Sequence, residues 1–359
     1  MYREVNFSQK DIWDEIVNSF NNVDIYFRWG YIKPFSDNRD GEPILFYYED
    51  DNGRVANIFL KRDIADCRYF KNIIDKEKYF DITSPYGYGG VLHEGTNEKL
   101  LAKAYVEEFE RYCADNNIIS EFIRFNPMIN NYKFLDEYYD ITFNRKTVYM
   151  KIDESEEKIL SDMDGKCRGR VRKAIKNGVI VKNGNTDDMI CKFSDLYLGT
   201  MDRDNAEEYY YFNKEFFFEV INELKDNSKI FTANIDERVI SAALVLFNEN
   251  YVHCHFLGND KEYLKLAPNN LLFFEIAKWG HENGKSIFHI GGGYQSENDN
   301  LFKFKSTFSK SNRFDFYIGK KIYNKEMYDY LVNIRGNNYS DSKFFPKYRE
   351  KDNALILNN

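Results

Sequence analysis

The sequence predicts an α/β fold of the mixed α+β kind, arranged as two domains that each hold a twisted, mixed, largely antiparallel sheet flanked by helices. Length is the first reason, because 359 residues are more than twice the ~150 of a typical domain. The second is that runs rich in β-branched and aromatic residues alternate with stretches of helical periodicity. The third is that the same order of elements occurs once in each half. An apolar content of 43%, with 17% aromatic residues, is enough for two buried cores.

The first half opens with a helix and a hairpin. Ser8 can cap a helix together with Asp11, and the apolar residues that follow fall on one helical face. The β-rich runs at 43–48 and 55–60 flank Asn52 and Gly53, which supply the positive φ angles of a tight hairpin turn. The rest of the half is predicted as a helix over 97–113, a strand over 118–125, a short helix after Pro127, and a strand over 142–151 that closes the half.

The second half repeats this order. We expect helices over 156–177, 187–200 and 213–224, and then strands over 229–234, 239–247 and 251–257. Pro268 at a first-turn position and Gly284 as a stop bound the next helix. A strand over 286–290, a helix over 299–308 and a strand over 314–318 complete the set. An amphipathic segment beyond Lys320 is expected to pack on the first domain. The predicted domains are therefore 1–151 joined by 320–359, and 152–319.

This order of elements resembles that of GNAT acyltransferases, so we expect two GNAT-like domains. Four segments, in chain order, resemble the Fem family of peptidoglycan-bridge aminoacyltransferases and the related Fem-like GNAT proteins of Gram-positive bacteria. They are DITSPYGYGG at 81–90, RFNP at 124–127, GKCRGRVRKAIKNGV at 165–179, and GGG at 291–293 ahead of DNLFKFKSTF at 299–308. The resemblance implies that the first domain lies on the acceptor side and that the second carries out the transfer.

The most specific of these segments places Phe304 and Lys305 on one short helix. From spacing alone, Lys305 would be a surface lysine at the edge of that helix, and Asp299 would be its N-cap. The resemblance implies instead that Phe304 and Lys305 match the Phe-Lys pair of the Fem active site, where a cation stabilises an oxyanion or a phosphate. The glycines Gly291 and Gly292 fit either a tight turn or a close approach to substrate, and both interpretations stay open.

A basic helix within 163–177 is a second candidate site. It carries six cations in eleven residues, which could bind phosphates of a tRNA, of CoA or of a nucleotide-linked acceptor. The candidates for donor binding are Arg168, Arg170, Arg172 and Lys173. The alternative is a solvated face whose cations pair with Glu156, Glu157 and Asp164.

Candidate acceptor contacts come from the remaining segments. The segment 81–90 combines glycines with Tyr86 and Tyr88, which can line a cleft, and Arg124 opens the second segment. A further Fem-like stretch over 200–212 contributes Arg203 and one of three consecutive tyrosines, of which Tyr210 is the candidate. A structural aromatic cluster is the alternative for this stretch.

Composition and missing motifs disfavour several classes of protein. The net charge of −8 argues against binding nucleic acid or anionic lipid over the whole surface, although a local basic patch is compatible with it. Five scattered cysteines fit reduced core thiols, and His253 and His255, without a third ligand, fit core histidines better than a metal site. The sequence lacks a Gly-x-Ser-x-Gly elbow, an HExxH motif and a Rossmann fingerprint, which disfavours hydrolases, metalloproteases and dehydrogenases.

The N-terminal residues carry charges and include no apolar signal region. The apolar stretches of the chain are shorter than the ~20 residues that span a bilayer. We therefore expect a cytoplasmic protein without a membrane segment, and the resemblance to the Fem family implies a bacterial one.

The predicted function is acyl or aminoacyl transfer, by direct attack of an acceptor amine on an ester or thioester carbonyl. The acceptor is predicted to be a peptidoglycan or polysaccharide precursor of the cell envelope. The predicted donor is aminoacyl-tRNA or acyl-CoA, with no permanently bound cofactor and no metal. CoA-dependent GNAT enzymes carry a glycine-rich loop before the helix that begins here at 268, and the stretch 260–270 has no glycine. The alternatives are a CoA-dependent N-acetyltransferase of a sugar or small amine, and a non-catalytic binding protein of the same fold.

Overall fold

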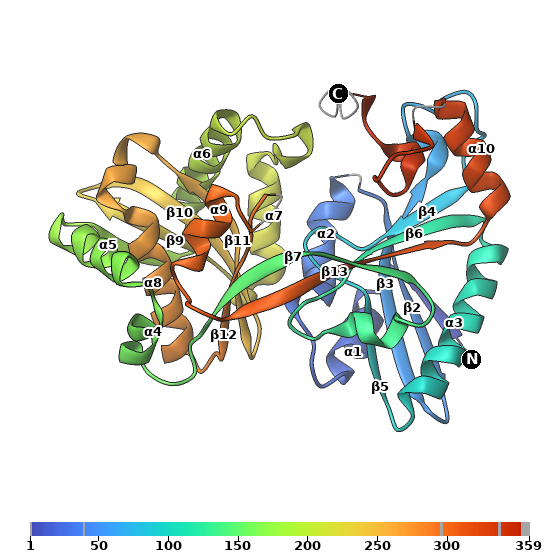
Figure 1. Ribbon diagram of the computed structural model, residues 1–359, viewed down its shortest axis with the longest axis horizontal. Helices are drawn as coiled ribbons and strands as arrows, with labels where there is room; N and C mark the ends of the chain where they lie inside the picture. Colours follow the sequence, from blue (N-terminus) through green and yellow to red (C-terminus); the bar gives the residue numbers. More distant parts are fainter. Residues whose placement is uncertain (1, 39, 295–296, 337–338, 353–359) are drawn as a thin grey trace. The chain divides into compact units, whose positions relative to one another are not determined.

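The computed structural model describes residues 2–38, 40–294, 297–336 and 339–352. The chain forms two compact units, one of Met1–Asn144 with Phe316–Asn359 and the other of Arg145–Asp315. Each unit holds a mixed sheet with helices on its faces (Figure 1), so the predicted fold class is confirmed. The predicted domain boundaries, 151/152 and 319/320, lie a few residues from the boundaries of these units.

The sheet of the first unit runs in the order β1-β2-β3-β4-β6-β13. Neighbouring strands are antiparallel except for β4 and β6, which are parallel. A further strand, β5, pairs with the part of β3 that β4 leaves free. The bounds are β1 (Tyr2–Asn6), β2 (Glu42–Asp50), β3 (Gly53–Asp63), β4 (Phe80–Thr83), β5 (Val91–Gly95), β6 (Ile118–Arg124) and β13 (Arg313–Ile322).

Helices cover both faces of this sheet. The helices of the unit are α1 (Lys10–Ser19), α2 (Trp29–Asp37), α3 (Glu98–Asp115) and α10 (Lys325–Arg335). On one face α3 packs Tyr105 and Phe109 against Ile123 of β6. On the other face α10 packs Tyr328 and Leu331 against Ile119.

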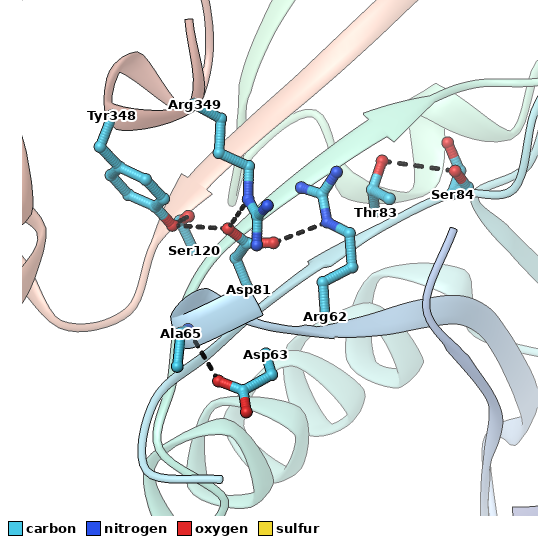
Figure 2. A network of polar contacts seen from close by, with 9 residues as sticks. All are labelled: Arg62, Asp63, Ala65, Asp81, Thr83, Ser84, Ser120, Tyr348 and Arg349. Carbon is cyan, nitrogen blue, oxygen red and sulfur yellow. Dashed lines mark hydrogen bonds and ion pairs between the residues drawn. The ribbon is translucent and has the colours of Figure 1, made fainter. Parts of the chain in front are cut away.

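A buried ionic network fixes the C-terminal segment to β4 (Figure 2). The carboxylate of Asp81, with no exposed surface, accepts hydrogen bonds from Arg62 Nε at 2.7 Å, Arg349 Nε at 2.5 Å and the Tyr348 hydroxyl at 2.9 Å. The Tyr348 hydroxyl also lies 2.9 Å from Ser120 Oγ on β6. Residues 348–349 are therefore held to the sheet by hydrogen bonds to a carboxylate that has no exposed surface. The predicted loop at 81–90 begins, in fact, within strand β4.

The sheet of the second unit runs in the order β7-β12-β11-β10-β9-β8. Only β11 and β12 are parallel, and the other neighbours are antiparallel. The bounds are β7 (Asp140–Lys151), β8 (Ile180–Gly184), β9 (Ser228–Ile235), β10 (Arg238–Phe247), β11 (Tyr251–Asn259) and β12 (Ile287–Gly292).

Helices α4, α5 and α8 cover one face of the second sheet, and α6 and α7 cover the other (Figure 1). The bounds are α4 (Glu156–Asp162), α5 (Gly165–Lys176), α6 (Asp187–Arg203), α7 (Lys214–Leu224), α8 (Pro268–Glu282) and α9 (Asn300–Ser306). The helix predicted over 156–177 is two helices, because Met163 and Asp164 take extended backbone angles between α4 and α5.

The two sheets have the same sequence of strand directions, but the halves exchange their last strands. Strand β7 follows β6 in the chain, yet its residues 147–151 pair with β12 of the second unit. Strand β13 follows β12 and α9, and its residues 318–322 pair with β6 of the first unit. The prediction that the strand over 142–151 closes the first half was therefore wrong. Each unit is completed by a strand from the other half.

Candidate active site

Strands β11 and β12 separate beyond one pair of residues. Their parallel pairing runs only to His253 opposite His289. Immediately beyond, the register shifts in both strands: His255 of β11 is an extra residue opposite β10, and Ile290 of β12 is an extra residue opposite β7. Such bulges redirect a strand and end its pairing. Beyond His289, strand β12 is no longer paired with β11, while Gly291 and Gly292 stay paired with Val148 and Thr147 of β7.

The glycines at the end of β12 surround Lys305. The backbone at Gly291 has φ +86°, which favours glycine, and a Cβ there would lie 3.3 Å from Lys305 Nζ. The carbonyl of Gly292 accepts a hydrogen bond of 2.8 Å from Lys305 Nζ. A Cβ on Gly293 would lie 2.2 Å from Asp299 Oδ2. The three glycines therefore serve both as a turn and as a close approach, and what they approach is Lys305 and Asp299.

Helix α9 aims Lys305 inward. Asp299 caps the helix, because its Oδ1 accepts a hydrogen bond of 2.7 Å from the Phe302 amide, as the sequence predicts. Burial lowers the pKa of Lys305, and the Arg145 cation lowers it further against the opposing effects of Cys254 and Asp299. Lys305 is thus a partly desolvated amine rather than a surface lysine, which corrects the interpretation from spacing alone.

Two of the groups near Lys305, Cys254 and His289, remain uncharged near neutral pH. Burial raises the pKa of Cys254 to about 12, although Lys305 opposes this shift. Burial lowers the pKa of His289 well below its usual value, with His253 and Lys305 adding to the effect. His289 Nε2 lies 2.9 Å from Thr147 Oγ1. A thiol with so high a pKa is a poor nucleophile near neutral pH, so this site is not built for attack by Cys254.

An arginine that sequence reasoning missed holds the segment after the glycines. Arg145 Nη1 of β7 donates to the carbonyl oxygens of Gly293 at 2.9 Å and Tyr294 at 2.6 Å. The Tyr294 hydroxyl donates in turn to Asp204 at 3.0 Å, and burial together with this hydrogen bond raises the pKa of Tyr294 to about 12. Asp204 also pairs with Arg203 Nε at 3.2 Å. The structure thus links Arg203, a predicted acceptor contact, to the glycine segment beside Lys305.

This second unit also matches a known family. Residues 162–305 match the family model described as the acetyltransferase (GNAT) domain. This segment is similar to a GNAT domain. The matched region begins at the end of α4 and reaches Lys305, so it includes α5, the diverging strands and α9 of the GNAT domain.

Known structures resemble the fold of this chain over most of its length. The crystal structure of FemX has a TM-score of 0.67 at 13% identity and covers 92% of this chain and 99% of its own. L-PGS from Bacillus licheniformis has a TM-score of 0.55 at 12% identity, covering 91% and 96%. The C-terminal domain of a putative lysylphosphatidylglycerol synthetase from Agrobacterium fabrum has 0.55 at 10%, covering 90% and 94%. The chain therefore has a Fem-like GNAT fold, as predicted. The sequence matches no curated protein significantly.

The N-terminus of helix α8 lies where CoA-dependent GNAT domains bind the CoA pyrophosphate, and here it has few free backbone N–H groups. Helix α8 begins with Pro268, which has no N–H, and the N–H of Asn270 donates to the Ala267 carbonyl at 3.2 Å. Asn269 accepts a hydrogen bond of 2.7 Å from Ser241 Oγ through its side chain. Anion binding at a helix N-terminus needs free backbone N–H groups. Two of the first three positions of α8 cannot supply one.

The cations of α5 reach solvent. Arg168 donates to the Met163 carbonyl, so its guanidinium is used within the α4–α5 connection. Arg170, Arg172 and Lys173 are exposed. No hydrogen bond or ion pair in the described part of the chain joins them to Lys305, so their role in donor binding stays a prediction.

Tyr210 belongs to an aromatic cluster. Its carbonyl accepts a hydrogen bond of 2.8 Å from the Tyr197 hydroxyl, and its ring meets that of Tyr209 edge to face with centroids 5.5 Å apart. These contacts agree with the structural alternative, and the acceptor contact at Tyr210 stays a prediction. Arg203, in contrast, lines a cavity of about 270 Å³ together with Asn259.

Three predicted acceptor contacts lie in the first unit. The ring of Tyr86 stacks on Phe35 at 5.5 Å, and Tyr88 packs edge to face against Tyr26 at 5.3 Å. Arg124 lies over the ring of Phe122 at 5.6 Å. Packing fixes all three side chains, and their role toward an acceptor stays a prediction.

Two kinds of site, a membrane-spanning helix and a metal-binding cluster, are absent from the described residues. No helix there is long and apolar enough to cross a bilayer. Nor does any cluster of three or more histidines, cysteines and carboxylates occur there that could hold a metal ion. His253 is buried, and its ring centroid lies 5.6 Å from that of His289.

Proposed function

We propose that the protein transfers an aminoacyl group from an activated ester to a primary amine of a cell-envelope precursor. The observation that carries this proposal is Lys305, a partly desolvated amine held by the Gly292 carbonyl at the end of the diverging strands. Support for an aminoacyl donor comes from the Fem-like fold and from a similar structure named as a lysylphosphatidylglycerol synthetase. Acyl transfer itself follows from the GNAT domain.

In the proposed reaction the acceptor nitrogen attacks the ester carbonyl carbon directly. The carbonyl oxygen becomes an oxyanion, the C–O bond to the leaving group then breaks, and the amine proton leaves to solvent or to the departing oxygen. Lys305 stabilises the oxyanion, and removal of one such donor typically costs about 10²–10³ in rate. No covalent enzyme intermediate is needed, in agreement with the protonated thiol of Cys254.

The start of α8 favours an ester donor over CoA. A CoA pyrophosphate needs several free N–H groups at this helix N-terminus, and Pro268 and Asn270 do not provide them. We therefore propose aminoacyl-tRNA as the donor and keep acyl-CoA as the alternative. The proposed acceptor contacts are Tyr86, Tyr88, Arg124, Arg203, Tyr210, Gly291 and Gly292.

Transfer assays with two donors test this proposal. The purified full chain is incubated with a UDP-linked muropeptide and either charged tRNA or labelled acetyl-CoA, and the product is followed by mass spectrometry. We expect an aminoacylated muropeptide from charged tRNA and no product from acetyl-CoA. An acetylated product alone would replace the ester donor with CoA. If neither donor reacts and the muropeptide still stabilises the fold in a thermal shift, the chain is a binding protein.

A further inference from the structure

Helix α5 and the strand that follows it form a surface of one charge sign. Residues 165–186, all described by the structure, contain no aspartate or glutamate, although the chain has a net charge of −8. The cations of this segment are Lys166, Arg168, Arg170, Arg172, Lys173, Lys176 and Lys182. Apart from Arg168, whose guanidinium binds the Met163 carbonyl, they are exposed side chains of α5 and β8. We call this set, with Ile175 and Ile180, the α5 surface.

The cations of the α5 surface are not neutralised within the protein. None of them forms an ion pair with a described residue. The carboxylates that could have paired with them are used elsewhere: Glu156 binds Lys278 at 3.1 Å, and Asp162 binds Lys158 at 2.5 Å. Of the alternative drawn from the sequence, a solvated face paired with Glu156, Glu157 and Asp164, the structure shows the exposure to solvent and, among the described residues, none of the pairs. An unpaired group of six cations on a protein with negative net charge is an attractive site for an anionic partner.

Two exposed isoleucines lie on either side of the turn that joins α5 to β8. Ile175, near the end of α5, is 55% exposed, and Ile180, the first residue of edge strand β8, is 62% exposed. Gly178, with φ +79° and open space around it, makes the turn that brings the helix end and the strand together. The β9–β10 turn, which carries Asp236 and Glu237, begins next to Asn234, the partner of Ile180, and bounds the surface on that side.

We propose that the α5 surface binds the protein to an anionic lipid membrane. Basic residues next to a membrane are attracted to its acidic headgroups, and apolar side chains among them enter the boundary with the acyl chains. A nucleic acid would satisfy the cations but would leave both isoleucines exposed to water. The segment 165–186 also has no aromatic residue that could stack on a base. The combination of unpaired cations and exposed aliphatic side chains therefore favours lipid over RNA.

Vesicle flotation of the full chain tests the charge component. The probes are vesicles of phosphatidylcholine alone and vesicles with equal parts of phosphatidylcholine and phosphatidylglycerol. We expect binding to the anionic vesicles only. The variant Arg172→Gln with Lys176→Gln should bind roughly tenfold or more weakly, because each basic residue near an anionic surface contributes about a factor of five. The matched control is Lys71→Gln with Lys133→Gln, which changes the net charge equally at two exposed lysines of the first unit.

A second pair of variants tests the apolar component. Ile175→Ser should weaken vesicle binding by roughly fivefold, from the loss of a half-exposed apolar side chain. The control is Ile73→Ser. Ile73 lies in the first unit and is 53% exposed, nearly the same as Ile175, so this change should leave binding unchanged.

The same proteins are titrated with uncharged tRNA to separate the two anionic partners. Equal binding of both vesicle types, no vesicle binding, or no effect of Ile175→Ser would each overturn the proposal. Binding of tRNA that weakens with Arg172→Gln and Lys176→Gln, in a protein that ignores anionic vesicles, would assign the surface to RNA instead. Neither measurement depends on transfer activity, so the result tests membrane binding independently of the proposed reaction.

Discussion

Replacing Asp81 by asparagine should strongly destabilise the first unit. The carboxylate has no exposed surface and binds two guanidinium groups, Arg62 and Arg349, together with the Tyr348 hydroxyl. Asp81→Asn preserves the shape but leaves two largely buried cations, with side chains 25% and 16% exposed, without their counter-charge. Breaking a buried ion pair from one side costs about 3–5 kcal/mol. Since ~1 kcal/mol shifts the melting temperature of a domain of this size by ~2–4 °C, a decrease of roughly 10 °C is expected.

The assay is urea unfolding followed by tryptophan fluorescence, to which Trp13 and Trp29 contribute from the first unit. The control is Asp66→Asn, which removes an exposed pair with Lys76 and should cost less than ~1 kcal/mol. Burial alone would raise the pKa of Asp81, but Arg349 and Arg62 outweigh it and hold the pKa below its usual value. The extra stability of the wild type should therefore be present above about pH 4 and decline as the pH falls through the folded-state pKa. Equal stability of Asp81→Asn and Asp66→Asn would refute the assigned role of the network.

Two further predictions concern other positions. Burial raises the pKa of Glu121 despite hydrogen bonds from two tyrosines. The stability that the protonated Glu121 side chain contributes should therefore be complete below the unfolded-state pKa of about 4.3. It should decline as the pH rises through the folded-state pKa. Glu121→Gln should remove that decline. The measurement is the free energy of unfolding by urea at pH values from 4 to 8, and the same pH dependence in the variant and the wild type would contradict the prediction. Gly293→Ala should reduce transfer at least ~10-fold, because its Cβ would lie 2.2 Å from Asp299 Oδ2 and displace the segment that holds Lys305. Gly199→Ala, whose Cβ would meet open space on helix α6, should leave transfer rates unchanged.

Local signals in the sequence identified most elements of the fold. The Asn52 and Gly53 turn joins β2 to β3, and Pro268 starts α8, because turn and helix-start chemistry depends on neighbouring residues alone. Short edge strands such as β1 and β8 were missed, since five mostly polar residues carry little periodic signal. The exchange of β7 and β13 was missed for a different reason. Which strand pairs with which is decided by contacts far apart in the chain, and local pattern does not record them.

The candidate site was predictable only in part. Spacing alone placed Lys305 on a surface, and its inward position depends on the positive φ of Gly291 and the carbonyl of Gly292, which only the folded backbone reveals. Resemblance to the Fem family supplied what spacing did not. Arg145 left no signal, because a lone arginine in a strand resembles any exposed cation. The bulge at His255, beyond which β11 and β12 are no longer paired, also could not be predicted from the sequence.

The central claim is that the Lys305 cation stabilises the oxyanion of acyl transfer. The most direct test compares single-turnover transfer by Lys305→Met with that by Lys303→Met, an exposed lysine on the same helix. We predict that Lys305→Met lowers the rate by about 10²–10³-fold while the donor binds with unchanged Kd. Lys303→Met should match the wild type. A rate for Lys305→Met within about threefold of wild type, well short of the loss expected for an oxyanion donor, would contradict the mechanism.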